Sequence, residues 1–168
     1  TYVINLYGIG GNLATEPIGQ PTNLIFSDVK TYKINAAFSP TDSVEGYLVL
    51  RKKGSPITGV PVDGTVYQRG DIVGDAQVVS SGVTTSLSPN NIVAETDYYF
   101  KIFSYNGPSG FRNYLTNTPL EGNVQTPASM MPPTYYSSLN TSSTSFMNDL
   151  HNLINPHHLN QKINKNSN

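Results

Sequence analysis

The sequence predicts an all-β protein of the sandwich or barrel class. Between residues 22 and 127, short segments of alternating apolar and polar residues follow one another without a convincing helical period. Short strands joined by turns are the pattern of β-sandwiches and barrels, and a length of 168 residues suits one such domain with tails. The turn-forming groups that separate the segments lie at 39–42, 62–64, 89–91 and 106–108.

Seven strands are expected in this region. The alternation at 33–38 places Ile34, Ala36 and Phe38 on one face of a strand. The segment 46–51 is apolar on both faces, with Tyr47 and Val49 on one and Leu48 and Leu50 on the other. The expected strands cover 23–27, 33–38, 46–51, 76–80, 84–87 and 98–105, and a last strand lies within 113–126.

The two ends of the chain have a different character. Residues 1–21 contain a strand-like stretch, a glycine-rich break and a Pro/Gly linker, which predicts the last strand of a preceding domain plus a linker. Residues 128–168 open on Met130-Met131-Pro132-Pro133. They then place Phe146, Met147, Leu150, Leu153 and Ile154 at helical spacing, which predicts a short C-terminal helix after a linker.

Composition excludes several classes of function. Ten Lys and Arg against eleven Asp and Glu give a formal net charge of −1, which is unlike a simple electrostatic nucleic-acid binder. The absence of cysteine excludes disulfide scaffolds, thiolate zinc sites and cysteine nucleophiles. No apolar run approaches the ~18 residues of a membrane span, so none is expected.

Residues 20–127 resemble a fibronectin type III domain. The family has Leu-x-Pro-x-Thr-x-Tyr before alternating apolar residues, and this register falls on Ile92, Ala94, Thr96 and Tyr98. The resemblance implies an immunoglobulin-like sandwich in which the Tyr98 hydroxyl bonds back to the backbone. Two departures are Ala94 in place of proline and the absence of tryptophan. The structural signature that the resemblance implies is Phe38, Tyr47, Thr96, Tyr98, Phe100 and Ile102.

Residues 46–79 look like the variant of this domain carried by many secreted proteins of Bacteroidota, which implies a secreted or cell-surface location. Tyr135-Tyr136 and Leu150-His151-Asn152-Leu153-Ile154 resemble the opening of the bacterial endonuclease I family. That family's catalytic His, Glu and metal-binding Asn belong to a downstream part. The resemblance therefore implies a divalent metal and nucleic-acid contact only through a downstream domain, with no catalytic role for His151.

Two sets of residues are candidates for a binding surface. Arg69-Gly70-Asp71 has the sequence of the integrin-binding adhesion tripeptide. The alternative explanation is that this short motif occurs by chance in a turn-rich loop. Tyr99, Phe103, Tyr105 and Phe111 are candidates for an exposed aromatic patch, although packing against the sheet is the favoured interpretation. The long segment 53–82 is a further candidate for recognising a glycan or a protein.

No catalytic, cofactor-binding or metal-binding residue is expected in this chain. His151, His157 and His158 cluster with Asp149, but adjacent histidines diverge, and histidines at a helix end are the favoured interpretation. Asn140-Thr141-Ser142 and Asp42-Ser43-Val44 have the form of glycosylation acceptors, which are common by chance. We therefore expect a non-catalytic spacer or accessory module, flanked by domains of the same polypeptide. The alternative is a glycan- or protein-binding module.

Overall fold

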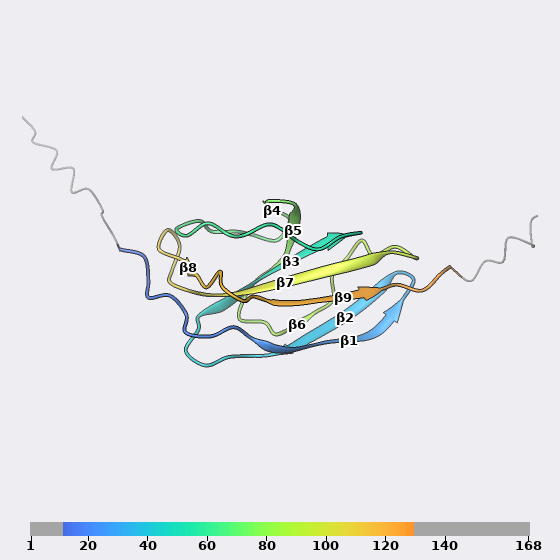
Figure 1. Ribbon diagram of the computed structural model, residues 1–168, viewed down its shortest axis with the longest axis horizontal. Helices are drawn as coiled ribbons and strands as arrows, with labels where there is room; N and C mark the ends of the chain where they lie inside the picture. Colours follow the sequence, from blue (N-terminus) through green and yellow to red (C-terminus); the bar gives the residue numbers. More distant parts are fainter. Residues whose placement is uncertain (1–11, 130–168) are drawn as a thin grey trace, which may run out of the picture. The chain divides into compact units, whose positions relative to one another are not determined.

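The computed structural model describes residues 12–129, in which nine strands form two antiparallel sheets packed face to face (Figure 1). One sheet has the strand order β1-β2-β6, and the other has the order β4-β5-β3-β7-β8, with β9 also paired to β7. The strands are β1 (Thr22–Lys30), β2 (Lys33–Ser39), β3 (Gly46–Lys53), β4 (Ile72–Val73), β5 (Ala76–Gly82), β6 (Ser86–Leu87), β7 (Asp97–Asn106), β8 (Asn113–Tyr114) and β9 (Leu120–Gln125).

This strand order is that of a fibronectin type III, immunoglobulin-like sandwich. In one layer β2 pairs with both β1 and β6, and in the other β3 pairs with the long β7, so the chain crosses between the layers as it does in that fold. The expected fold class is therefore confirmed. The region 113–126 holds two short strands rather than one, and β4 was not expected.

The inner faces of the two sheets form the main core. Ile34, Ala36 and Phe38 of β2 are all buried, as their alternation predicted. The rings of Phe38 and Tyr47 meet edge to face at 5.0 Å between centroids, which joins the two layers. The cluster that fills this interior is Ile34, Phe38, Tyr47, Val49, Val79, Ile92, Tyr98, Phe100 and Ile102.

A second apolar cluster covers the outer face of the larger sheet. Leu48 and Leu50 of β3 are fully buried there, because residues 54–75 fold back over the sheet instead of leaving that face to solvent. Both faces of β3 are consequently buried, as is usual for a strand with a continuous apolar run. The cluster consists of Leu48, Leu50, Ile57, Val73, Ala76, Val78, Phe103, Tyr105 and Tyr114.

Asp75 fastens this covering segment, residues 54–75, to the sheet. Its carboxylate accepts hydrogen bonds from the Thr58 amide and hydroxyl and from the Gly59 amide, and it pairs with Lys52 at 2.7 Å. The bond from the Lys52 ammonium, followed by that from Thr58, holds the pKa of Asp75 below its ordinary value. Gly59 lies so close to the Val73 carbonyl oxygen that a Cβ there would overlap it.

Residues 14–20 lie against the sandwich, although the sequence predicted a linker there. Ala14 donates its amide hydrogen to the Phe111 carbonyl at 2.9 Å, and Asn106 donates to the Thr15 carbonyl at 2.9 Å. The Gln20 side chain accepts from the Ser104 amide at 2.9 Å and donates to the Leu115 carbonyl. This part of the expected linker is therefore hydrogen-bonded along β7 and β8.

Candidate functional site

Of the three aromatic residues Tyr99, Phe103 and Tyr105, only Tyr99 is partly exposed. Phe103 is fully buried and Tyr105 is 4% exposed, since both contribute to the cluster under the covering segment. The candidate surface role is thus wrong for Phe103 and Tyr105, and the favoured interpretation, packing against the sheet, is confirmed for both. Tyr99 and Phe111 are half-buried.

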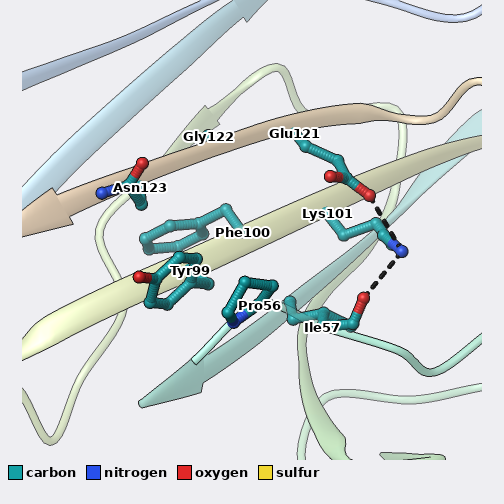
Figure 2. Close-up of a pocket in the computed structure, with 8 residues that line it drawn as sticks. All are labelled: Pro56, Ile57, Tyr99, Phe100, Lys101, Glu121, Gly122 and Asn123. Carbon is teal, nitrogen blue, oxygen red and sulfur yellow. Dashed lines mark hydrogen bonds and ion pairs between the residues drawn. The ribbon is translucent and has the colours of Figure 1, made fainter. Parts of the chain in front are cut away.

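Tyr99 borders a hollow of about 260 Å³ on the outer face of β7 and β9. The register pairs Tyr99 with Asn123 and Lys101 with Glu121, so four outward-facing side chains form two adjacent pairs. Figure 2 shows Tyr99 and Asn123 toward one end and Lys101 with Glu121 toward the other, while Pro56 and Ile57 lie opposite β9. We call this hollow, lined by Pro56, Ile57, Tyr99, Phe100, Lys101, Glu121, Gly122 and Asn123, the β7–β9 groove.

An ion pair closes one end of the β7–β9 groove. Lys101 Nζ lies 2.9 Å from Glu121 Oε1 and also donates to the Ile57 carbonyl at 2.8 Å (Figure 2). The lysine side chain is 12% exposed and the glutamate 56%, so the carboxylate is the more accessible member. The groove can therefore accept hydrogen bonds through Glu121 and donate or accept through the exposed Asn123.

Sequence reasoning singled out Tyr99 as a surface candidate, and its candidate segment 53–82 contains Pro56 and Ile57, but it did not assign Lys101, Glu121 or Asn123 to a site. Lys101 could have been identified from the sequence as a neighbour of Tyr99, because it lies two residues further along the same strand face. Glu121 and Asn123 carried none, since their position depends on the pairing register of β9 with β7. Pro56 and Ile57 reach the groove only because the covering segment folds back.

The adhesion tripeptide lies in an exposed turn, but its two charged side chains are engaged within the domain. The Asp71 amide donates to the Gln68 carbonyl at 3.1 Å, and the Asp71 carboxylate accepts from the Gln68 amide at 2.7 Å. Arg69 donates to Asn90 Oδ1 at 3.2 Å. Because the Asp71 carboxylate closes its own turn, this geometry does not favour a free ligand built from Arg69-Gly70-Asp71.

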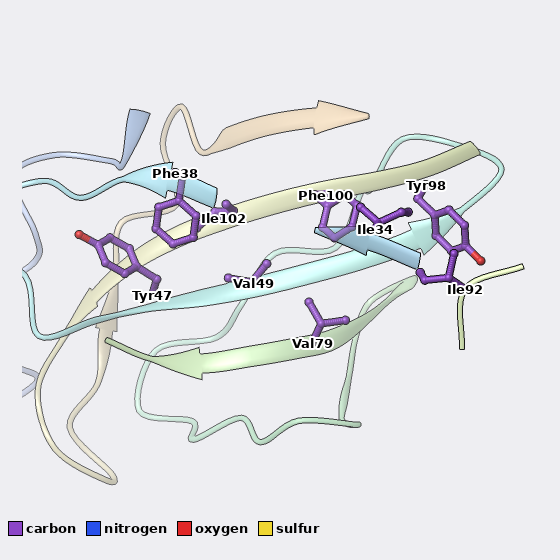
Figure 3. Close-up of a cluster of buried hydrophobic side chains, with 9 residues drawn as sticks. All are labelled: Ile34, Phe38, Tyr47, Val49, Val79, Ile92, Tyr98, Phe100 and Ile102. Carbon is purple, nitrogen blue, oxygen red and sulfur yellow. The ribbon is translucent and has the colours of Figure 1, made fainter. Parts of the chain in front are cut away.

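Five of the six fibronectin-type signature residues gather in the main core (Figure 3), and the sixth, Thr96, is half-buried. Tyr98 is fully buried, and its hydroxyl accepts a hydrogen bond from the Val93 amide at 2.9 Å and donates to the Asn91 carbonyl at 3.5 Å. Thr96 donates its hydroxyl hydrogen to the Ala94 carbonyl at 2.8 Å, although alanine stands where the family has proline. The remaining members, Phe38, Tyr47, Phe100 and Ile102, are buried.

Arg51 is a buried cation that sequence reasoning missed. It is 6% exposed, donates to the Asn90 carbonyl at 2.7 Å and lies 5.4 Å from the centre of the Tyr98 ring. Burial lowers its pKa, the nearby Tyr98 opposes that effect, and Arg69 adds to it. Arg51 thus closes the end of the core at which Tyr98 lies.

The Asp42-Ser43-Val44 triplet lies apart from the β7–β9 groove. Ser43 of the Asp42-Ser43-Val44 triplet is exposed, has a φ of 60° and lines a shallow hollow of about 370 Å³ with Thr15 and Asn106. Within residues 12–129, no group of three metal-ligating side chains occurs, and no helix is long and apolar enough to cross a membrane. The candidates that lie outside the described residues are Tyr135-Tyr136, the Asn140 acceptor, the 150–154 helix motif, Asp149, His151, His157 and His158.

The chain is similar to several solved structures of β-sandwich domains. The chain is 16% identical to a human "forth FNIII domain", covering 68% of this chain and 82% of that one at a TM-score of 0.47. It is 15% identical to the domain of human fibronectin type III domain containing protein 3, covering 74% and 98% at a TM-score of 0.45. A computer-redesigned β-sandwich is 18% identical, with 67% and 98% covered at a TM-score of 0.46.

No protein-family model matches the sequence, and no curated protein matches it. The fold assignment therefore rests on the strand order and on the two buried clusters.

Proposed function

We propose that residues 22–127 act as a non-catalytic spacer or accessory module of a secreted multidomain protein. The observation that carries this proposal is that the described chain enters and leaves the sandwich at opposite ends (Figure 1). The entering segment is bonded through Thr15 to Asn106, the last residue of β7, and the leaving segment through Pro127 to Glu95, just before β7 begins. A ten-residue strand spans about 30 Å, so the module separates what it joins by that distance.

The charged side chains of the sandwich support a structural role. Asp28 bridges Lys30 and Lys33 at the β1–β2 turn, Asp75 fastens the covering segment, and Glu121 pairs with Lys101. These carboxylates are thus used to fix turns and strand pairs. Such a scaffold is suited to holding neighbouring domains apart.

The neighbour we propose on the C-terminal side is an endonuclease I-type domain. This proposal is supported by the resemblance of Tyr135-Tyr136 and 150–154 to the opening of that family. In this arrangement a divalent metal and nucleic acid belong to the downstream domain, and the sandwich contributes neither ligands nor catalytic groups.

The size and activity of the native gene product test both parts. An antibody against residues 22–127 should detect a polypeptide much heavier than 18.3 kDa in the culture medium of the host. That heavy product should degrade DNA in the presence of Mg²⁺, whereas the isolated 168-residue chain should not. A native product near 18.3 kDa would overturn the spacer role. A heavy product without nuclease activity would overturn only the identity of its neighbour.

A further inference from the structure

We propose that the β7–β9 groove is a binding site for a neutral glycan, with one sugar ring lying beside Tyr99 and its hydroxyl groups bonded to Asn123 and Glu121. This activity is additional to the spacer role and does not depend on it. The side chains come from two paired strands and one covering segment, so the site exists only in the folded sandwich.

The shape and chemistry of the β7–β9 groove match a sugar ring. A pyranose has apolar C–H faces and a periphery of hydroxyl groups, and it needs both an apolar surface and polar partners. The rings of Tyr99 and Pro56 provide the apolar surface, and Asn123 lies directly across the strand pair from Tyr99 (Figure 2). A volume of about 260 Å³ is slightly below the usual ~300–1,000 Å³ of small-molecule sites, which suits a single ring of a longer chain.

The polar groups of the groove have unused hydrogen-bonding capacity. Among the described residues, the Tyr99 hydroxyl and the side-chain amide of Asn123 have no hydrogen-bond partner, and the Glu121 carboxylate pairs with Lys101 through Oε1. Glu121 Oε2 can accept hydrogen bonds from sugar hydroxyls, while Asn123 can both donate and accept. The Glu121 carboxylate and the Asn123 side-chain amide both belong to β9, on either side of Gly122.

The charge arrangement selects for a neutral ligand. Lys101 and Glu121 neutralise each other, and the lysine ammonium also donates a hydrogen bond to the Ile57 carbonyl. The carboxylate is the exposed member, so an anionic polysaccharide would meet negative charge at that end of the groove. A hydroxyl-rich, uncharged polymer meets no such repulsion.

The groove is preorganised. Lys101 ties Ile57 to β7, Asp75 ties Thr58 and Gly59 to the turn after β4, and Lys52 Nζ donates to the Pro56 carbonyl at 3.2 Å. Pro56 is therefore anchored at its own carbonyl and through the residues that follow it. The other lining side chains lie on paired strands, which hold groups more firmly than loops do. Little ordering remains to be done on binding, and this favours measurable affinity for a weak ligand such as a sugar.

Backbone amide NMR shifts of the full 168-residue chain test the proposal. The probes are neutral hexasaccharides with cellulose, xylan, mannan and starch linkages. An acidic oligogalacturonate and a proline-rich peptide serve as alternative probes. At least one neutral probe at millimolar concentration should shift the amides of residues 57, 99–101 and 121–123 and leave those of β1 and β2 unchanged.

Three variants assign the binding to the groove. Tyr99→Ala should weaken binding by about tenfold or more, and the exposed Asn123→Ala should weaken it without disturbing the fold. Tyr32→Ala removes a tyrosine that is 71% exposed at the β1–β2 turn and should bind as the parent does. The proposal is overturned if no neutral probe shifts the groove amides, if Asn123→Ala leaves affinity unchanged, or if only the acidic probe or the peptide binds.

Discussion

Tyr98 joins the start of β7 to the loop that precedes it, and its hydroxyl is the most informative single group in the main core. Tyr98→Phe removes the bonds to the Val93 amide and the Asn91 carbonyl while keeping the ring in place. Because the Val93 amide then loses its partner, we expect the free energy of unfolding in urea to fall by about 1–2 kcal/mol. Tyr32→Phe, at an exposed tyrosine, should change it little. Equal unfolding energies for the two variants would show that the hydroxyl bond does not stabilise the fold.

Asp75 predicts how acid affects the covering segment. Its pKa is held below the ordinary value of 3.8 by the bonds from Lys52 and Thr58, so the folded state favours the carboxylate. The resulting stabilisation is present above that ordinary value and is lost as the pH falls through the lowered pKa of the folded protein. We expect the urea midpoint to decrease between about pH 4 and pH 2.

The matched variants for this effect are Asp75→Asn and Asp42→Asn. Asp75→Asn should lower the midpoint at neutral pH and reduce its acid dependence, leaving the part that comes from Asp28, whose pKa Lys30 and Lys33 lower to about 2. Asp42 is exposed in the β2–β3 connection, and Asp42→Asn should keep the acid dependence of the parent chain. If Asp75→Asn retained that full dependence, other carboxyl groups would be responsible for it.

At the scale of elements, the strand pattern could be predicted from the sequence, whereas the packing of the covering segment, residues 54–75, on the sheet could not. The alternations at 33–38 and 46–51 correctly assigned the faces of β2 and β3 because a period of two is a local property. The run Tyr47–Leu50 places apolar residues on both faces of the strand, yet nothing local identifies which segment covers the second face. That choice depends on the contact of Gly59 with Val73 and Gly74 and on the Asp75 bonds, which join residues 14 to 17 positions apart.

For the side chains around the β7–β9 groove, too, local alternation was predictable and contacts with a distant segment were not. Tyr99 was a candidate for a surface patch because it alternates with the core residues Tyr98 and Phe100. Phe103 and Tyr105 have the same alternation with Ile102, and only the covering segment makes them differ from Tyr99. Exposure was therefore predictable only where no distant segment packs on the strand.

Ile57 is the residue that tests whether the covering segment stabilises the sheet. It is 6% exposed and packs in the cluster that contains Phe103, whereas Val62 of the same segment is 63% exposed. Ile57→Ala should lower the free energy of unfolding in urea by about 2–5 kcal/mol, because it leaves a cavity under the cover. Val62→Ala should stay within about 0.5 kcal/mol of the parent chain. Similar small losses for both would mean that residues 54–75 lie loosely on the sheet.

At the scale of the whole sandwich, the spacer proposal depends on the ends of the described chain being fixed far apart. The entering segment is held by bonds to Phe111, Asn106 and Ser104, and the leaving segment by bonds through Thr126 and Pro127 to the loop before β7. Both attachments are on opposite ends of the same ten-residue strand. A rigid separation follows from the hydrogen bonds rather than from the length of the chain.

The most direct test of this claim is a spin-label distance measurement between the two ends. The chain has no cysteine, so Glu16→Cys and Ala128→Cys, both at exposed positions, give two unique labelling sites. We expect one narrow distance distribution centred at about 30–45 Å, allowing for the span of β7 and the label arms. A distribution centred below about 20 Å, or one spread evenly over the whole accessible range, would contradict a rigid, two-ended spacer.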